Sequence, residues 1–165
     1  MIKHCLMLVA LFLGIQAANA QTLVQGSLDV LRGEEYVKVV VDYSNALIMD
    51  MTEVEFAKWE KDWYKDQPQI MSELIEEVND KWDGVLRLSR TRTTNYILRW
   101  AVKWIDESGT IMSDFYLETA GGEVIAVIEN VRGKGGVFGT KLYLIKTGAE
   151  STGRTLGKFL RKQLK

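Results

Sequence analysis

The chain has 165 residues, of which 47% are hydrophobic and 26% charged, and a formal net charge of −1 at pH 7. This length fits a single domain with a substantial core, and the hydrophobic content excludes a disordered chain. The near-zero charge gives no general attraction to polyanions, so we do not expect nucleic acid as a partner.

The first twenty residues have the three parts of a secretory signal peptide. A basic start with Lys3 is followed by an apolar run over 5–15 and by the small-residue end Ala18-Asn19-Ala20. We expect cleavage after Ala20, which makes 1–20 a leader and 21–165 a single domain in the periplasm or outside the cell. The run is shorter than the ~20 residues that span a bilayer, so we expect no transmembrane segment in the mature chain.

The predicted leader contains the only cysteine, Cys5, and the only histidine, His4. The mature chain would therefore have no disulfide, no Ser-His-Asp triad, no cysteine nucleophile and no ordinary zinc site. We predict neither a metal nor a cofactor. Gln21 stands where a bacterial lipoprotein has its lipidated cysteine, which argues against a lipid anchor.

Residues 21–35 give a weak signal for an edge strand or a packed arm. The β-branched and aromatic run over 36–43 predicts a strand. Thr52 and Glu55 match a capping box, so a helix should start there. Its expected apolar stripe consists of Phe56, Trp59 and Trp63. Pro68 is expected to open a second helix, which Asp83 and Gly84 would end.

Four strands are predicted next, over 85–90, 96–105, 110–119 and 124–131. Turn signals separate consecutive segments, so these strands should form an antiparallel meander. Together with the helices, they predict an α+β fold of two layers. We expect a mostly antiparallel sheet of four to six strands, with the helices on one face.

A glycine-rich loop over 132–139 precedes a last helix that should begin between Thr140 and Thr147. In that helix Ala149, Gly153 and Gly157 are spaced four apart and share one side. Because glycine weakens a helix by about 0.5–1 kcal/mol relative to alanine, we expect a packing reason, namely close contact of the helix with the sheet.

The glycine-rich loop is the best positive candidate for a ligand or partner contact. Its glycines could direct backbone N–H groups at a phosphate or carboxylate, and two cations would assist. The contact residues would be Arg132, Gly133, Lys134, Gly135 and Gly136. The segment is not a phosphate-binding P-loop, because no lysine directly follows its last glycine. The alternative is a turn that exposes two solubilising cations.

Two acidic residues could take part in carboxylate chemistry. Asp42 ends an apolar strand and Asp114 interrupts another, so either could be partly buried. Hydrolysis by a carboxylate pair needs two acids about 5–10 Å apart, one of them with a raised pKa. The alternative is that both acids are solvated or hydrogen-bonded to turns.

Several cations follow two predicted strands and could form a basic patch for a polyanion. They are Arg87, Arg90, Arg92, Arg99 and Lys103. With the neighbouring Tyr96 they would combine cations and an aromatic ring, as surfaces that bind single-stranded nucleic acid do. The alternative is an ordinary solvated sheet face, neutralised by acids such as Asp114 or Glu118.

The order of elements resembles small exported proteins of unknown function that are common in gut Bacteroidota. The resemblance rests on the 37–43 strand, the helix start at 52–56, Lys61-Asp62-Trp63-Tyr64, the meander, Gly133-x-Gly135-Gly136 and the 148–157 segment with Gly148, Gly153 and Gly157. It implies an uncharacterised α+β domain with a glycine-rich loop before a C-terminal helix. The element order is also similar to the α/β domains of envelope lipoproteins that assemble secretion or cell-wall machinery.

The leading functional hypothesis is an exported envelope or secreted protein that acts as a non-enzymatic binding or assembly accessory domain. Its partner would be an unknown envelope protein or a small ligand, bound through the glycine-rich loop. The first alternative is a carboxylate-dependent hydrolase using Asp42 and Asp114. The second is a polyanion-binding module built on the patch from Arg87 to Lys103.

Overall fold

A computed structural model describes residues 21–82, 84 and 86–165 of the chain. The predicted signal peptide, with Cys5 and His4, lies outside the described residues. So do Asp83 and Val85, which fall at the predicted end of the second helix and the start of the strand after it.

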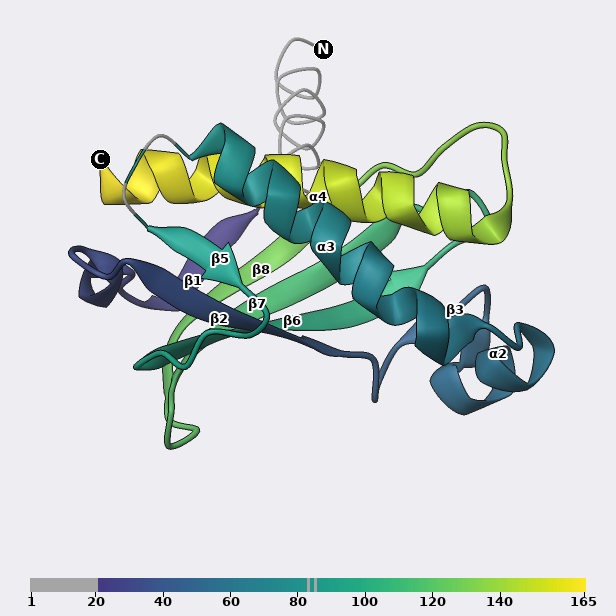
Figure 1. Cartoon of the computed structure of the whole chain (residues 1–165), viewed down its shortest axis with the longest axis horizontal. Helices are drawn as coiled ribbons and strands as arrows, with labels where there is room; N and C mark the ends of the chain where they lie inside the picture. Colours follow the sequence, from purple (N-terminus) through teal and green to yellow (C-terminus); the bar gives the residue numbers. More distant parts are fainter. Residues whose placement is uncertain (1–20, 83, 85) are drawn as a thin grey trace, which may run out of the picture.

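The described residues form one mixed sheet of eight strands, covered on one face by helices (Figure 1). Six strands follow one another across the sheet in the order β1 (Thr22–Gly26), β8 (Val124–Gly133), β7 (Ile111–Thr119), β6 (Tyr96–Ile105), β2 (Tyr36–Asp42) and β5 (Arg87–Ser89). The short strands β3 (Leu47–Ile48) and β4 (Met51–Thr52) lie off this path.

The sheet has an antiparallel half and a parallel half that meet at β6. β1, β8, β7 and β6 pair antiparallel, whereas β2 runs parallel to both β6 and β5. β3 follows β2 along the same edge of β6 and pairs Leu47 with Trp104, again in parallel. The first part of β6 therefore pairs with β2, and the end of β6 pairs with β3.

The predicted fold class is wrong in strand number and in strand direction. The meander over β6, β7 and β8 accounts only for the antiparallel half. β2 inserts between β5 and β6, which creates parallel pairs on both of its sides. The strands β1, β3 and β4 add to the count. Two of these three have only two residues, too few to show an alternating pattern.

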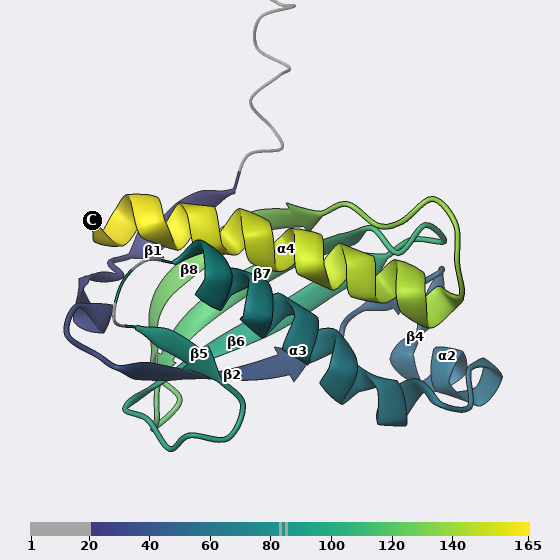
Figure 2. The ribbon, with the colours of Figure 1, turned by 45° about the horizontal axis from the view of Figure 1, so that its top comes forward.

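Two long helices, α3 (Trp63–Lys81) and α4 (Lys141–Leu164), lie across one face of the sheet (Figure 2). The core lies between these helices and the sheet, and its largest fully buried side chains are Trp63, Trp100, Phe56 and Phe115. The short helix α2 (Glu53–Trp59) begins with the predicted capping box: Glu55 Oε2 accepts from the Thr52 amide at 2.9 Å, and Thr52 Oγ1 accepts from the Glu55 amide at 3.4 Å.

Pro68 lies inside α3 rather than at its start. The helix begins five residues earlier at Trp63, whose side chain is only 1% exposed and whose indole N–H donates to Glu53 Oε1 at 3.3 Å. Burial of this indole holds the first turn, although Pro68 cannot donate the usual amide hydrogen bond. Trp59 is not part of the core: it is 52% exposed, and the Lys141 ammonium lies 3.2 Å from its ring centroid.

The glycines of α4 allow close packing, mainly against α3 rather than the sheet. A Cβ on Gly153 would overlap the Leu74 carbonyl oxygen, and a Cβ on Gly157 would lie 3.0 Å from Lys81 Cβ. These two positions therefore bring α3 and α4 together. Gly148 instead faces the turn between β6 and β7, where a Cβ would overlap the Gly109 carbonyl oxygen.

The Gly153→Ala substitution should lower the free energy of unfolding by roughly 2–3 kcal/mol, because the added methyl group meets backbone that cannot move aside. This loss exceeds the gain of about 1 kcal/mol in helix propensity. Urea denaturation measures it. Gly121→Ala is the control, since its Cβ would meet nothing closer than Thr119 Oγ1 at 3.6 Å. Equal stability of both variants would contradict the close packing of α3 on α4.

Candidate functional site

The face of the sheet opposite α3 and α4 carries a polar hollow centred on Ala101. Ala101 of β6 pairs with Asp42 of β2 on one side and with Asp114 of β7 on the other. Residues in register on neighbouring strands point to the same face, so the two acids flank the small alanine side chain. The hollow measures about 430 Å³, and its lining residues are Asp42, Asn45, Arg99, Ala101, Val102, Lys103, Asp114 and Tyr116.

Ion pairs neutralise the charges of this hollow. Arg99 lies 3.3 Å from Asp42 and 2.7 Å from Glu118, measured between guanidinium nitrogens and carboxylate oxygens. Its guanidinium carbon also lies 4.4 Å from the centroid of the Tyr116 ring. Lys103 Nζ lies 2.7 Å from Asp114 Oδ1. The two cations are thus matched by three acids, so this face has no surplus of positive charge.

Asp42 and Asp114 share the hollow, but Asp42 is unsuited to act as a general acid. Hydrogen bonds from the Ser44 hydroxyl and amide, assisted by the charge of Arg99, lower the Asp42 pKa below its ordinary value. A hydrolytic pair needs one acid whose pKa is raised. The backbone amide of Asn130 donates to Asp114 Oδ1 at 2.9 Å, and Lys103 forms an ion pair with the same carboxylate. The structure therefore brings the two predicted acids into one hollow and gives each of them structural partners.

The cations predicted as a polyanion patch fall into different environments. Arg99 and Lys103 are paired with acids on the open face. Arg87 donates to the Trp82 carbonyl at 3.2 Å, close to the end of α3. Arg90 donates to the Pro68 carbonyl at 3.0 Å, and the Arg92 guanidinium lies 4.7 Å from the Tyr36 ring centroid. Asp114 and Glu118 are among the acids that neutralise Lys103 and Arg99. This arrangement matches the alternative interpretation, an ordinary sheet face whose cations are neutralised by acids.

In the glycine-rich loop, two of the backbone amides that could hold an anion are already hydrogen-bonded. The Lys134 amide donates to Ser151 Oγ at 2.9 Å, and the Gly135 amide donates to Thr110 Oγ1 at 3.1 Å. A Cβ on Gly133 would overlap Thr152 Oγ1, and one on Gly135 would overlap the Ser108 carbonyl oxygen. These glycines therefore let the end of β8 and the following loop approach α4 and the turn between β6 and β7.

Sequence reasoning missed the most exposed apolar side chains of the same loop. Val137 is 78% exposed and Phe138 is 86% exposed, and they lie just beyond the anchored Gly135. Arg132 and Lys134 are exposed at the base of the loop. The signal was present in the sequence, because an adjacent valine and phenylalanine between Gly136 and Gly139 have no neighbouring apolar pattern to join.

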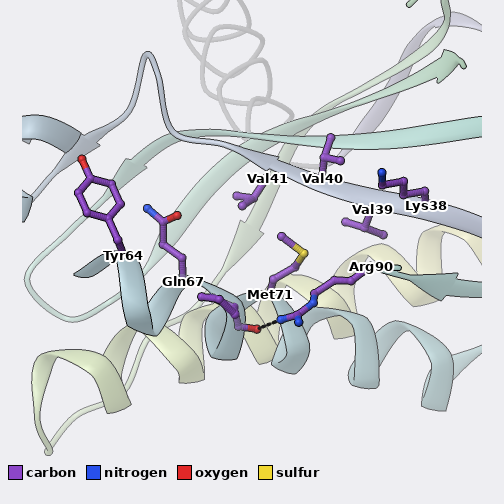
Figure 3. Close-up of a pocket in the computed structure, with 9 residues that line it drawn as sticks. Lys38, Val39, Val40, Val41, Tyr64, Gln67, Met71 and Arg90 are labelled. Atoms are coloured by element: carbon purple, nitrogen blue, oxygen red, sulfur yellow. Dashed lines mark hydrogen bonds between the residues drawn. The ribbon is translucent and has the colours of Figure 1, made fainter. Parts of the chain in front are cut away.

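Sequence reasoning also missed a groove between β2 and α3 (Figure 3). It measures about 360 Å³ and is lined by Lys38, Val39, Val40, Val41, Tyr64, Gln67, Pro68, Met71 and Arg90. No pattern in the sequence predicts this groove, because it forms where α3 packs beside β2, and the sequence does not show which helix lies beside which strand.

Within residues 21–82, 84 and 86–165, no group of three or more acidic, histidine or cysteine side chains is arranged to hold a metal ion. In the same described part, no helix is both long and apolar enough to cross a membrane.

Comparison with known proteins leaves the family open. No family model matches the chain, and no curated protein matches it. Among solved structures, a PelC variant dodecamer from Paraburkholderia phytofirmans is 15% identical at a TM-score of 0.40, with 89% of this chain and 100% of that chain covered. Another PelC dodecamer from the same organism is 12% identical at a TM-score of 0.38, with 83% and 98% covered. Similarity this low supports no inference about function.

The Ser44→Ala substitution should raise the Asp42 pKa toward its ordinary value, because it removes the hydroxyl that donates to Asp42 Oδ1 at 2.6 Å. A lowered carboxyl pKa stabilises the folded state above the unfolded value of about 3.9, and this contribution is lost as the pH falls through the folded-state pKa. As the pH falls from the unfolded pKa through the folded-state pKa of Asp42, the free energy of unfolding should therefore decrease less for Ser44→Ala than for the wild type. NMR titration of the Asp42 carboxyl carbon measures the pKa directly.

Ser108→Ala is the matched control, because Ser108 makes the same pair of hydrogen bonds to Asp106 and none to Asp42. It should leave the Asp42 titration unchanged. An Asp42 pKa that is the same in the wild type and in Ser44→Ala would contradict the assigned cause.

Proposed function

We propose that this chain is an exported, non-enzymatic domain that binds a partner protein of the cell envelope or extracellular space. The contact surface is the tip of the loop after β8, formed by Val137 and Phe138. The observation that carries this proposal is the exposure of these two adjacent apolar side chains, at 78% and 86%. The exported location rests on the leader predicted over 1–20, which lies outside the described residues.

The base of the loop is held in place, which favours binding at its tip. The amides of Lys134 and Gly135 bond to side chains of α4 and of the segment before β7, so the base of the loop is fixed on two sides. A preorganised loop loses little conformational entropy when a partner covers it. Full burial of an exposed phenylalanine side chain contributes roughly 1.5–3 kcal/mol. The tip can therefore serve as an apolar anchor for a pocket on another protein.

Cations at the base of the loop define the rim of this contact. Arg132 and Lys134 are exposed, and neither has a carboxylate within ion-pair distance among the residues that the structure describes. A partner with an apolar pocket and an acidic rim would match the tip. Charges at the rim of an interface speed association more than they add to affinity.

The two alternative functions have less support. The hydrolase would need a proton donor, and Asp42 is held as a carboxylate by Ser44 and Arg99. The polyanion module would need free cations on one surface, whereas Arg99 and Lys103 are paired with acids. A protein contact at the loop tip requires neither a proton donor nor a surface of free cations.

The Phe138→Ser substitution should reduce recovery of the partner from a native envelope fraction by about tenfold or more, because it removes the apolar anchor without touching the core. Affinity capture with the tagged full chain, quantified by mass spectrometry, measures the recovery. The paired variant Arg132→Ala/Lys134→Ala should give a smaller loss. Val24→Ser is the control, since Val24 is 51% exposed on the distant edge strand β1. Unchanged recovery with Phe138→Ser would overturn the proposed contact.

A further inference from the structure

The second half of β2 has an unpaired edge. β5 pairs only with Tyr36, Val37 and Lys38, whereas β2 continues to Asp42. From Val39 onward, β2 has β6 on one side and no strand on the other within the described residues. The register of β2 on β6 runs from Lys38 to Asp42 without a bulge, so this edge is regular.

The backbone of Val41 faces that open edge. The Glu35 carbonyl accepts from the Arg87 amide at 2.8 Å, which shows that the peptide groups of residue 35 face β5. Peptide groups in a strand alternate between its two edges, so those of Val37, Val39 and Val41 face the same side. Beyond the end of β5, the Val39 carbonyl and both backbone groups of Val41 are left for another strand.

The groove described above runs along this edge and has an apolar wall. Val39 and Val41 lie on its β2 side, and Pro68 and Met71 of α3 lie on the other. Tyr64 lies toward one end and Arg90 toward the other, where the Arg90 guanidinium is bonded to the Pro68 carbonyl (Figure 3). The groove therefore combines a row of backbone hydrogen-bonding groups with an apolar wall.

The end of the groove at Arg90 carries uncompensated positive charge. Neither Lys38 nor Arg90 has a carboxylate within ion-pair distance among the described residues. The bond from Arg90 to Pro68 uses one guanidinium nitrogen, and a guanidinium has five N–H donors. A carboxylate placed here would meet the Arg90 guanidinium, which can bind it through two hydrogen bonds.

We propose that this groove binds an extended, acidic peptide segment of another protein, which adds a strand to the open edge of β2. Backbone hydrogen bonds to Val39 and Val41 hold the segment, as in other cases of β-strand addition. An apolar side chain of the segment packs on Pro68 and Met71, and an Asp or Glu side chain pairs with Arg90. At about 3.3 Å per residue, the edge from Val39 to Asp42 accepts three to four residues.

This site is independent of the loop tip proposed above, because different elements form it. An edge of this kind is normally covered or protected by charges and bulges. The edge formed by Val39, Val40 and Val41 has neither a charged side chain nor a bulge. A small anion could use Arg90 alone, whereas only a peptide uses the open backbone, the apolar wall and Arg90 together.

The test is a titration of the ¹⁵N-labelled full chain with acetyl-Asp-Val-Thr-Val-Thr-amide, followed by NMR. The proposal expects saturable shifts of the Val41 amide and of the α3 amides near Gln67 and Met71. Replacing the probe's aspartate by asparagine should weaken binding roughly three- to tenfold, as expected for a charge-assisted contact. Shifts confined to other surfaces, including the loop at Phe138, would overturn the proposal, as would equal binding of both probes.

Two variants assign the charge contact. In Arg90→Gln, the preference for the acidic probe over the neutral one should fall to about twofold or less, the range of a weak exposed ion pair. Lys158→Gln, an exposed charge change on α4, should leave the preference intact. An unchanged preference in Arg90→Gln would overturn the proposed role of this arginine. Tight binding of the asparagine probe as its free C-terminal acid, but not as its amide, would contradict recognition of an acidic side chain.

Probes with backbone N-methyl groups test strand addition on the unmodified protein. One probe is methylated on its odd residues and the other on its even residues, so each loses the amide donors on one edge only. Strand addition predicts that one probe loses at least about tenfold in affinity while the other binds nearly normally. Equal affinity of the two probes would overturn binding through the backbone.

Discussion

The parallel pairing of β2 with β6 is the constraint on which the rest of the structure depends. A parallel partner cannot be reached by a tight turn, so the chain must cross between the strands. The crossing carries α2 and α3, and it sets α3 on the same face as α4. The short β5 then covers only the first half of β2. The groove beside α3 is the direct result.

A sheet covered on one face only must make its other face compatible with water. Apolar packing is concentrated between the sheet and the two long helices, where Gly153 lets α4 approach α3. The open face instead carries Asp42, Arg99, Lys103 and Asp114 as neighbouring ion pairs. Pairing removes the charge surplus that a polyanion would need. The loop tip and the open edge of β2 are two surfaces that can still gain from a partner.

Local signals in the sequence predicted local structure well, whereas contacts between distant segments could not be predicted. The alternation over Tyr96–Ile105 and the capping box at Thr52 were each confirmed, since each depends on a few neighbouring residues. The partners of β2 depend on segments up to about sixty residues away, and no periodicity encodes them. For the same reason, the sequence offered Asp42 and Asp114 as acids but not their shared position beside Ala101.

β2 pairs with β6 from Lys38 to Asp42 and keeps its other edge open beyond Lys38. Amide hydrogen exchange in the free protein tests this arrangement, because successive amides of β2 face opposite edges. The Val40 amide faces β6 and should exchange at least about a hundredfold more slowly than the Val41 amide, which faces the groove. Equal protection of the Val40 and Val41 amides would show that this edge of β2 is covered, which contradicts an open edge.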